Sequence, residues 1–127
     1  MTGVTYDSGA LIAAERGERQ MWARHRALLL RRIVPIVPAA VIAQCWRGTP
    51  GQAQLARLLA GCETEPLDDT RARATGTLAS RASVADIVDA SVIEGALRRG
   101  DLIISSNERD LIAIAAAVGR RVDIDHP

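Results

Sequence analysis

Three aspartates stand at positions where a carboxylate is costly. Asp7 follows the run GVTY, Asp89 lies inside the apolar stretch IVDASVI, and Asp110 comes shortly after LIISS. An unpaired charge held among apolar side chains costs several kcal/mol unless a cation shares its site. Mg²⁺ and Mn²⁺ prefer carboxylate and water oxygens as ligands. The sequence therefore predicts an acidic pocket that binds a divalent metal.

Helix capping is the alternative explanation for some of these positions. The residues with a side chain and a spacing suited to a cap are Asp7, Ser8, Ser83, Asp86, Asn107 and Asp110. For Asp86, capping and a supporting role in the pocket remain equally open. Asp89 lies beyond the capping positions if its helix begins near Ala85, so we expect Asp89 to serve the pocket.

The elements that must position these residues alternate along the chain. Short apolar runs alternate with longer segments of helical period, which is typical of a parallel sheet with crossover helices. The predicted strands are 3–6, 33–37, 62–67, 102–105 and 121–124. The predicted helices are 9–16, 20–31, 39–47, 52–60, 69–80, 85–99 and 108–118, with Pro38 in a first helical turn. We predict an α/β fold, a single domain over residues 1–127, with a central parallel sheet of about five strands flanked by helices.

This order of elements can bring the acidic residues together. Ligands of open parallel sheets bind beyond the carboxyl ends of the strands. Asp7 ends the first predicted strand, and Asp110 follows the fourth. Asp86 and Asp89 are three residues apart in the helix before that strand, and hence lie on one helix face. Four carboxylates can thus converge at one edge of the sheet.

Composition limits the class of protein. With 127 residues, 48% of them hydrophobic, the chain can bury one core. It contains no apolar run of the roughly 20 residues that span a bilayer, and its first residues lack the order of a signal peptide. We expect a soluble, cytoplasmic protein without a membrane partner.

The sulfur, imidazole and indole groups suggest no second site. Cys45 and Cys62 lack metal-ligand spacing and are expected to be buried reduced thiols. His25 and His126 are isolated and are expected to lie at the surface. Trp22 and Trp46 are expected to pack against apolar neighbours rather than to stack on the bases of a nucleic acid.

The basic residues are all arginine. Residues 1–60 contain eight Arg and three acids, whereas residues 61–127 contain eight Arg and twelve acids. Arginine suits bidentate contacts with phosphate, but a compositional bias of the genome explains its use equally well. An Arg-bearing face beside an acidic pocket could hold the phosphates of a nucleic acid.

Three segments of the sequence resemble the PIN-domain ribonucleases, in particular the VapC-type toxins of toxin–antitoxin pairs. VTYDSGALIAAE resembles the first strand, metal-ligand aspartate and first helix of that family, and PIVPAAVIAQCWRG resembles its second strand and following helix. DIVDASVIEGALRRGDLIISSNERDL resembles its D-A-x-I helix, next strand and final acidic turn. The resemblance spans nearly the whole chain and implies a PIN-like fold.

The resemblance also implies roles for individual residues. The catalytic and metal-binding acids would be Asp7, Asp89 and Asp110, with Asp86 as an auxiliary metal ligand. Gln44 occupies a position that is usually Glu, so an oxygen ligand is kept but a negative charge is lost. Residues that could orient ligands or water, or contact substrate, are Ser8, Gln44, Arg47, Ser105 and Asn107. Asn107 stands where many relatives have Asp.

The activity implied by the resemblance is that of an endoribonuclease that depends on Mg²⁺ or Mn²⁺ and attacks RNA with a metal-activated water. Its implied partners are an RNA substrate, a cognate antitoxin and a second copy of the chain. A PIN-fold module that binds antitoxin or RNA without cutting is the alternative, and Gln44 is its support. A phosphoacceptor receiver domain would need a lysine, which the sequence lacks.

Overall fold

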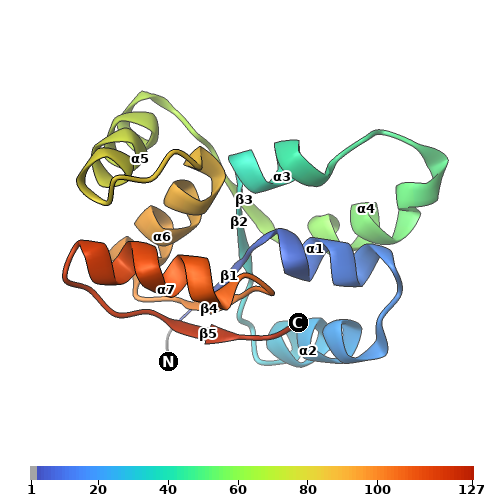
Figure 1. Cartoon of the computed structure of the whole chain (residues 1–127). Coiled ribbons are helices and arrows are strands. Elements are labelled where there is room, and N and C mark those ends of the chain that lie inside the picture. The colour runs from blue at the N-terminus through green and yellow to red at the C-terminus, as the bar shows by residue number, and fades with distance from the viewer. Residues whose placement is uncertain (1–2) are drawn as a thin grey trace.

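Five parallel strands form the centre of the molecule, in a computed structural model that describes residues 3–127 (Figure 1). The strands are β1 (Val4–Tyr6), β2 (Ile36–Pro38), β3 (Glu63–Glu65), β4 (Leu102–Ile104) and β5 (Asp123–Asp125). Their order is β3-β2-β1-β4-β5, and every neighbouring pair is parallel. The predicted α/β fold is confirmed, while residues 1 and 2 of the predicted domain lie outside the described residues.

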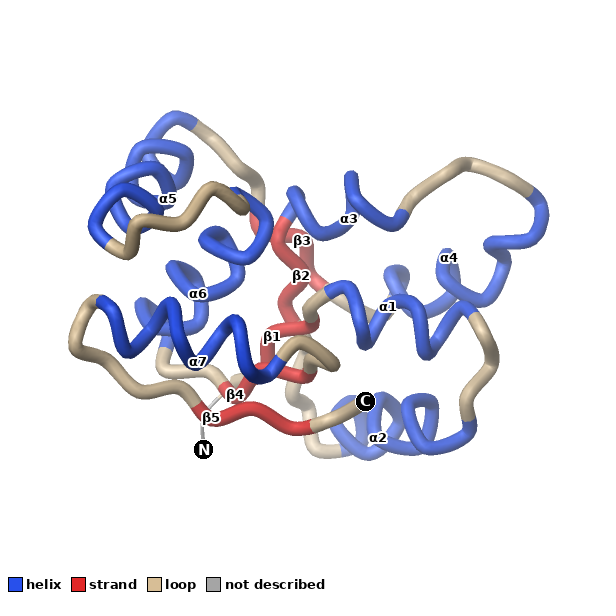
Figure 2. Tube along the Cα trace, viewed as in Figure 1, coloured by secondary structure: helices blue, strands red, loops and turns tan. Residues whose placement is uncertain are grey.

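Helices cover both faces of this sheet. They are α1 (Ser8–Glu15), α2 (Arg19–Leu30), α3 (Ala39–Cys45), α4 (Ala53–Ala60), α5 (Asp69–Arg81), α6 (Ile87–Arg99) and α7 (Glu108–Ala117), with a 3₁₀ turn at Pro50–Gln52. Figures 1 and 2 show α1, α2 and α4 on one side of the sheet and α5, α6 and α7 on the other. Helix α3 packs against both α1 and α6. Within residues 3–127, no helix is both long and apolar enough to cross a membrane.

The order of the strands leaves a crevice beside β1. The chain passes from β1 outward to β2 and β3, then returns to place β4 on the other side of β1. Connections from β1 and β4 thus diverge beyond their carboxyl ends, where α/β sheets bind ligands. Both strands are firmly held, since Val4, Tyr6, Ile103 and Ile104 are buried between the two helical layers.

Several element boundaries differ from the prediction. Pro38 ends β2, where it pairs with Glu65, and it precedes the first residue of α3 instead of lying within that helix. Helix α6 begins at Ile87 rather than near Ala85, because Asp86 has an extended backbone (φ −79°, ψ 102°) and takes the capping position before the helix. The later start of α6 changes the setting of its aspartates.

The burial of some histidine and tryptophan side chains also differs from the prediction. His25, predicted at the surface, is only 4% exposed, and its Nδ1 lies 2.9 Å from the Tyr6 hydroxyl. Burial lowers the pKa of His25. His126 is exposed, as predicted. Trp22 packs against the core as predicted, but Trp46 is 43% exposed, so its predicted packing role is wrong.

Both cysteines are free thiols, in agreement with the prediction of reduced cysteines. Cys45 and Cys62 are half-buried rather than fully enclosed. Burial raises the pKa of each thiol, so both stay protonated at neutral pH. Neither has the electropositive surroundings of a reactive thiolate.

Candidate active site

A buried carboxylate lies at the end of the central strand. Asp7 directly follows β1, and its backbone N–H donates to the carbonyl of Ile104 (3.0 Å), which extends the pairing of β1 with β4. Asp7 is 1% exposed. Its Oδ2 accepts a hydrogen bond from Ser105 Oγ (2.7 Å), whereas its Oδ1 is buried without a hydrogen-bond partner in the described part of the chain. A buried carboxylate oxygen without a partner is rare and needs an explanation.

Ser105 connects this carboxylate to the turn after β4. Its hydroxyl donates to Asp7 and accepts from the backbone N–H of Asn107 (2.9 Å), so one buried side chain fixes both segments. The Asn107 side chain does not cap α7, as the capping alternative supposed. Its Nδ2 donates instead to Asp89 Oδ2 (3.3 Å), which orients that carboxylate.

Asp86 is the residue that caps α6. Its Oδ1 accepts from the backbone N–H of Asp89 (3.0 Å), and Ser83 does not take part. Asp89 therefore lies in the first turn of the helix, and the expectation that it lies beyond the capping positions is wrong. A carboxylate is favourable there because the helix dipole is positive at this end. Its side chain nevertheless remains available, since among residues 3–127 only Asn107 forms a hydrogen bond with it.

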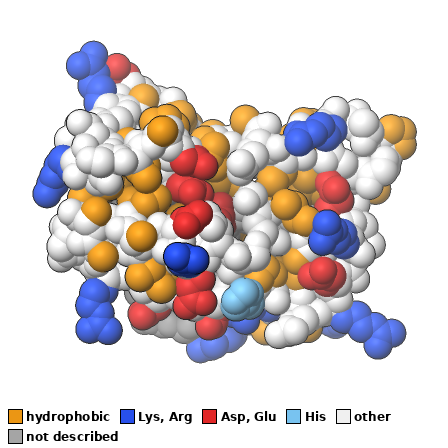
Figure 3. All heavy atoms as spheres, viewed as in Figure 1, with side chains coloured by type: hydrophobic (Ala, Val, Ile, Leu, Met, Phe, Trp, Pro, Cys, Tyr) orange, Lys and Arg blue, Asp and Glu red, His pale blue; other side chains and the backbone are white. Residues whose placement is uncertain are grey.

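The structure brings four aspartates to one crevice. The pKa of Asp89 is raised to about 6, first by burial and then by the negative charges of Asp86, Asp7 and Asp110. Asp86, Asp89 and Asp110 also line one cavity of about 350 Å³ between α6 and α7. Figure 3 shows acidic side chains in a band between the α6/α7 side of the molecule and the α1/α3 side. This gathering of like charges favours a bound cation.

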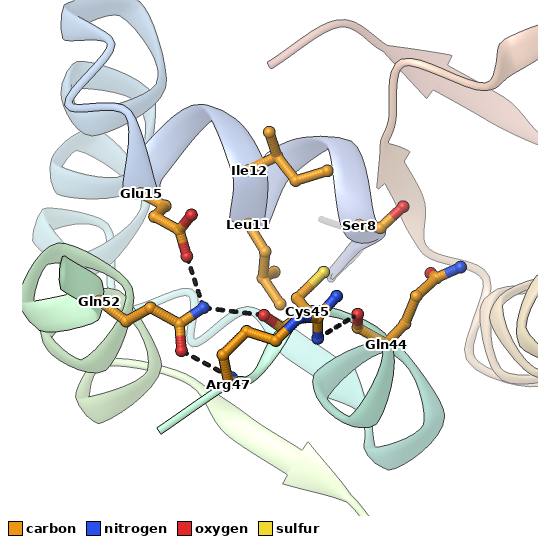
Figure 4. Close-up of a pocket in the computed structure, with 8 residues that line it drawn as sticks. All are labelled: Ser8, Leu11, Ile12, Glu15, Gln44, Cys45, Arg47 and Gln52. Carbon is orange, nitrogen blue, oxygen red and sulfur yellow. Dashed lines mark hydrogen bonds between the residues drawn. The ribbon is translucent and has the colours of Figure 1, made fainter. Parts of the chain in front are cut away.

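A second cavity of about 350 Å³ lies between α1 and α3 (Figure 4). Ser8 and Gln44 lie at one end of it, and the Gln44 side chain is exposed. Arg47 donates from Nη1 to the carbonyls of Gln44 (2.9 Å) and Trp46 (3.0 Å). Arg47 thus caps the carboxyl end of α3 and, among residues 3–127, forms no ion pair with an acid.

Two positioning residues escaped the sequence analysis. Gln52 is 5% exposed; its Nε2 donates to Glu15 (2.7 Å) and to the Cys45 carbonyl (2.8 Å), and its Oε1 accepts from two backbone N–H groups of the loop after α3. Gly9 lies so close to the turn after β4 that an added Cβ would be 2.7 Å from Ser106 N. A neutral amide in a loop gives no sequence signal, whereas a glycine in the first turn of a helix is a weak one.

Comparison with known proteins identifies the fold. No family model matches the sequence, and no curated protein matches it. Among solved structures, VapBC2 from Rickettsia felis bound to a fragment of promoter DNA contains a chain that matches with a TM-score of 0.75 at 10% identity, covering 98% of both chains.

Two further structures agree with this match. FitAB bound to the IR36 DNA fragment matches with a TM-score of 0.65 at 14% identity, over 98% of this chain and 94% of that one. DNA-bound VapBC from Salmonella typhimurium matches with a TM-score of 0.62 at 16% identity, over 99% and 98%. The likeness extends over the whole chain, which has a PIN-like α/β fold.

Proposed function

We propose that this protein is a metal-dependent endoribonuclease of the PIN-domain kind, acting as the toxin of a toxin–antitoxin pair. The observation that carries the proposal is the buried Asp7, whose Oδ1 has no hydrogen-bond partner among residues 3–127 and whose charge lies near those of three further aspartates. The fold supports the same class, because its neighbours among solved structures are chains of VapBC and FitAB complexes.

The crevice suits a hard divalent cation. Asp7, Asp89 and Asp110 would hold Mg²⁺ or Mn²⁺, with Asp86 as an auxiliary acid. Within residues 3–127, no three His, Cys, Asp or Glu side chains are grouped so that they could hold an ion by themselves. Ligation would therefore include water, as Mg²⁺ sites usually do. When bound, such a cation makes a water more acidic and stabilises negative charge on a phosphodiester.

Other side chains of the protein would position the aspartates, the water and the substrate. Ser105 holds Asp7 in place, and Asn107 orients Asp89. Without a metal Asp89 has a pKa of about 6, and a bound cation would favour its charged form, so metal binding near neutral pH would release a proton from this carboxyl. Ser8 and Gln44 line the separate cavity between α1 and α3, and from there they could orient water or contact the substrate.

The proposed partners follow from the same reasoning. RNA is the substrate, and a small antitoxin protein is the regulator, by analogy with the two-component VapBC and FitAB assemblies. We further propose that the protein works in the cytoplasm as a homodimer. A module that binds antitoxin or RNA without cutting is the second candidate, favoured by the missing charge at Gln44 and by the absence of a complete group of ligands among residues 3–127.

The decisive experiment compares Asp7→Asn with the native protein. Cleavage of RNA in Mg²⁺ or Mn²⁺ should fall by about 100-fold or more, because several kcal/mol of stabilisation would be lost. Calorimetry should show weaker Mn²⁺ binding by the variant. Asp123→Asn, at an exposed position of β5, is the matched control and should cut RNA like the native protein.

The outcomes separate the two candidates. Equal cleavage by the native protein and Asp7→Asn would contradict the assignment of the site. A native protein that binds RNA and Mn²⁺ but leaves the RNA intact would favour the non-cutting module.

A further inference from the structure

A second cavity in the α5/α6 half of the molecule is rich in arginine. It has a volume of about 430 Å³ and is lined by Arg73, Leu78, Arg81, Leu97, Arg98 and Arg120, among others. We call this surface the arginine groove. Leu78 and Leu97 give it a half-buried apolar floor, and the arginines surround that floor.

Two of these arginines are not neutralised. Arg73 pairs with Asp69 (3.0 Å), and Arg98 pairs with Glu65 and Glu94. Arg81 and Arg120 are exposed and form no ion pair with any residue in the described range 3–127. The arginine groove therefore presents two uncompensated guanidinium groups beside an apolar floor.

Helix α6 runs from the acidic crevice, which its first turn borders with Asp89, to the arginine groove, which its last turns border with Leu97 and Arg98. Arg81 directly precedes Ala82, which lines the cavity that also contains Asp86, Asp89 and Asp110. Leu97 lies eight residues after Asp89 in α6, or about 12 Å along the helix axis. In Figure 3 basic side chains lie at the left edge, over the end of α5 and beyond α7, away from the central acidic band. An RNA segment of a few nucleotides would be long enough to reach from the acidic crevice to the arginine groove.

We propose that the arginine groove holds the phosphates of the RNA that flanks the cleaved bond. The planar fork of arginine binds phosphate oxygens in pairs, and an apolar floor suits the faces of sugars and bases. Because Arg81 and Arg120 are positively charged, they favour a negatively charged RNA over a neutral peptide. This inference rests on the proposed nuclease function and adds the path of its substrate.

Binding of a short fluorescent single-stranded RNA tests the proposal. The full-length protein is studied in EDTA, so that RNA is not cut, over a range of salt concentrations. The double variant Arg81→Gln/Arg120→Gln should raise Kd by about tenfold and reduce the salt slope by about 1.4, which is the value for two lost phosphate contacts.

The matched control is Arg19→Gln/Arg26→Gln, which removes two exposed arginines from α2. Its Kd and salt slope should equal those of the native protein. Arg81→Lys/Arg120→Lys keeps the charge without the fork and should give an intermediate Kd. Because all these side chains are exposed, circular dichroism should show every variant folded.

The result that overturns the proposal is an unchanged Kd and salt slope in Arg81→Gln/Arg120→Gln. A change in molecular mass on light scattering would overturn it as well, since the arginine groove would then be an interface between copies. If the native protein fails to cut RNA, only the nuclease function is rejected, and RNA binding that depends on Arg81 and Arg120 still stands. If it cuts RNA and the double variant binds normally, only the arginine groove is rejected.

Discussion

At the scale of single residues, the aspartates of the site differ in the groups that donate hydrogen bonds to them. Asp7 is held by the Ser105 hydroxyl, Asp86 by a backbone N–H, and Asp89 by the Asn107 amide. Burial raises the pKa of Asp89 to about 6, and the charges of Asp86, Asp7 and Asp110 add to this effect. Ionisation of Asp89 should therefore lower the stability of the folded protein by a measurable amount.

A pH-dependent comparison with Asp89→Asn should reveal this cost. The pKa of Asp89 rises from 3.8 to about 6 on folding, so the folded state binds the proton more tightly. The native protein should lose stability relative to the variant as the pH rises from 3.8 to about 6. In EDTA, we expect similar thermal midpoints near pH 4. Well above pH 6, Asp89→Asn should have the higher midpoint.

Adding Mn²⁺ at neutral pH supplies the complementary measurement. The ion should raise the midpoint of the native protein, because it binds the folded state alone, and should raise that of Asp89→Asn much less. Equal effects of Mn²⁺ on both proteins would contradict the assignment of Asp89 as a ligand.

At the scale of elements, the site depends on how closely α1 approaches the turn between β4 and α7. Gly9 makes this approach possible, since a Cβ there would be 2.3 Å from Ser106 Oγ and 2.7 Å from Ser106 N. Ser106 lies between Ser105, which holds Asp7, and Asn107, which orients Asp89. A shift of this turn would thus disturb two carboxylates together.

Gly9→Ala tests this approach, with Gly76→Ala as the matched control. Gly76 lies in α5 and has no atom within 4 Å of an added Cβ, so its replacement should stabilise the protein by about 0.5–1 kcal/mol. Gly9→Ala should instead destabilise the protein and weaken Mn²⁺ binding. Urea unfolding and calorimetry measure both effects, and a stabilising Gly9→Ala with normal Mn²⁺ binding would show that the turn adapts freely.

At the scale of the whole molecule, a chain of ion pairs connects elements that are distant in the sequence. Asp101 accepts from Thr5 of β1 and from Arg99 of α6, both at 2.8 Å. Arg99 and Arg98 each donate to Glu65 of β3 at 2.6 Å. Burial would raise the pKa of Glu65, but these arginines outweigh it and lower that pKa. The network ties the end of α6 to two strands, far from the acidic crevice.

Asp101→Ala should therefore lower the free energy of unfolding without changing the acidic crevice. The Asp101 side chain is 3% exposed, so its removal leaves Arg99 buried and partly unpaired, and we expect a loss of about 3 kcal/mol in the free energy of unfolding. Asp69→Ala, which breaks an exposed pair with Arg73, should cost less than about 1 kcal/mol. Urea unfolding measures both, and equal losses would contradict the structural role of the network.

The sequence by itself determined the class of fold and the positions of the acidic residues. Alternating apolar runs and helical segments predict a parallel sheet, because strand and crossover periodicities are local properties of the chain. The same pattern places Asp7 and Asp110 beyond the carboxyl ends of the first and fourth strands, whereas the structure shows that these two strands are neighbours. These predictions depend on spacing alone, and they hold without knowledge of any contact.

Only the tertiary structure decided which side chains meet. Asn107 bonds to Asp89 rather than capping α7, and His25 is buried against Tyr6. Within residues 3–127, Arg81 forms no ion pair, whereas Arg98 pairs with two acids. The contacts of Asn107 with Asp89, of His25 with Tyr6 and of Arg98 with Glu65 join residues from different elements, and no local pattern predicts them. The physical reason is that partner choice and burial depend on how helices pack across the sheet, whereas periodicity depends only on neighbours in the chain.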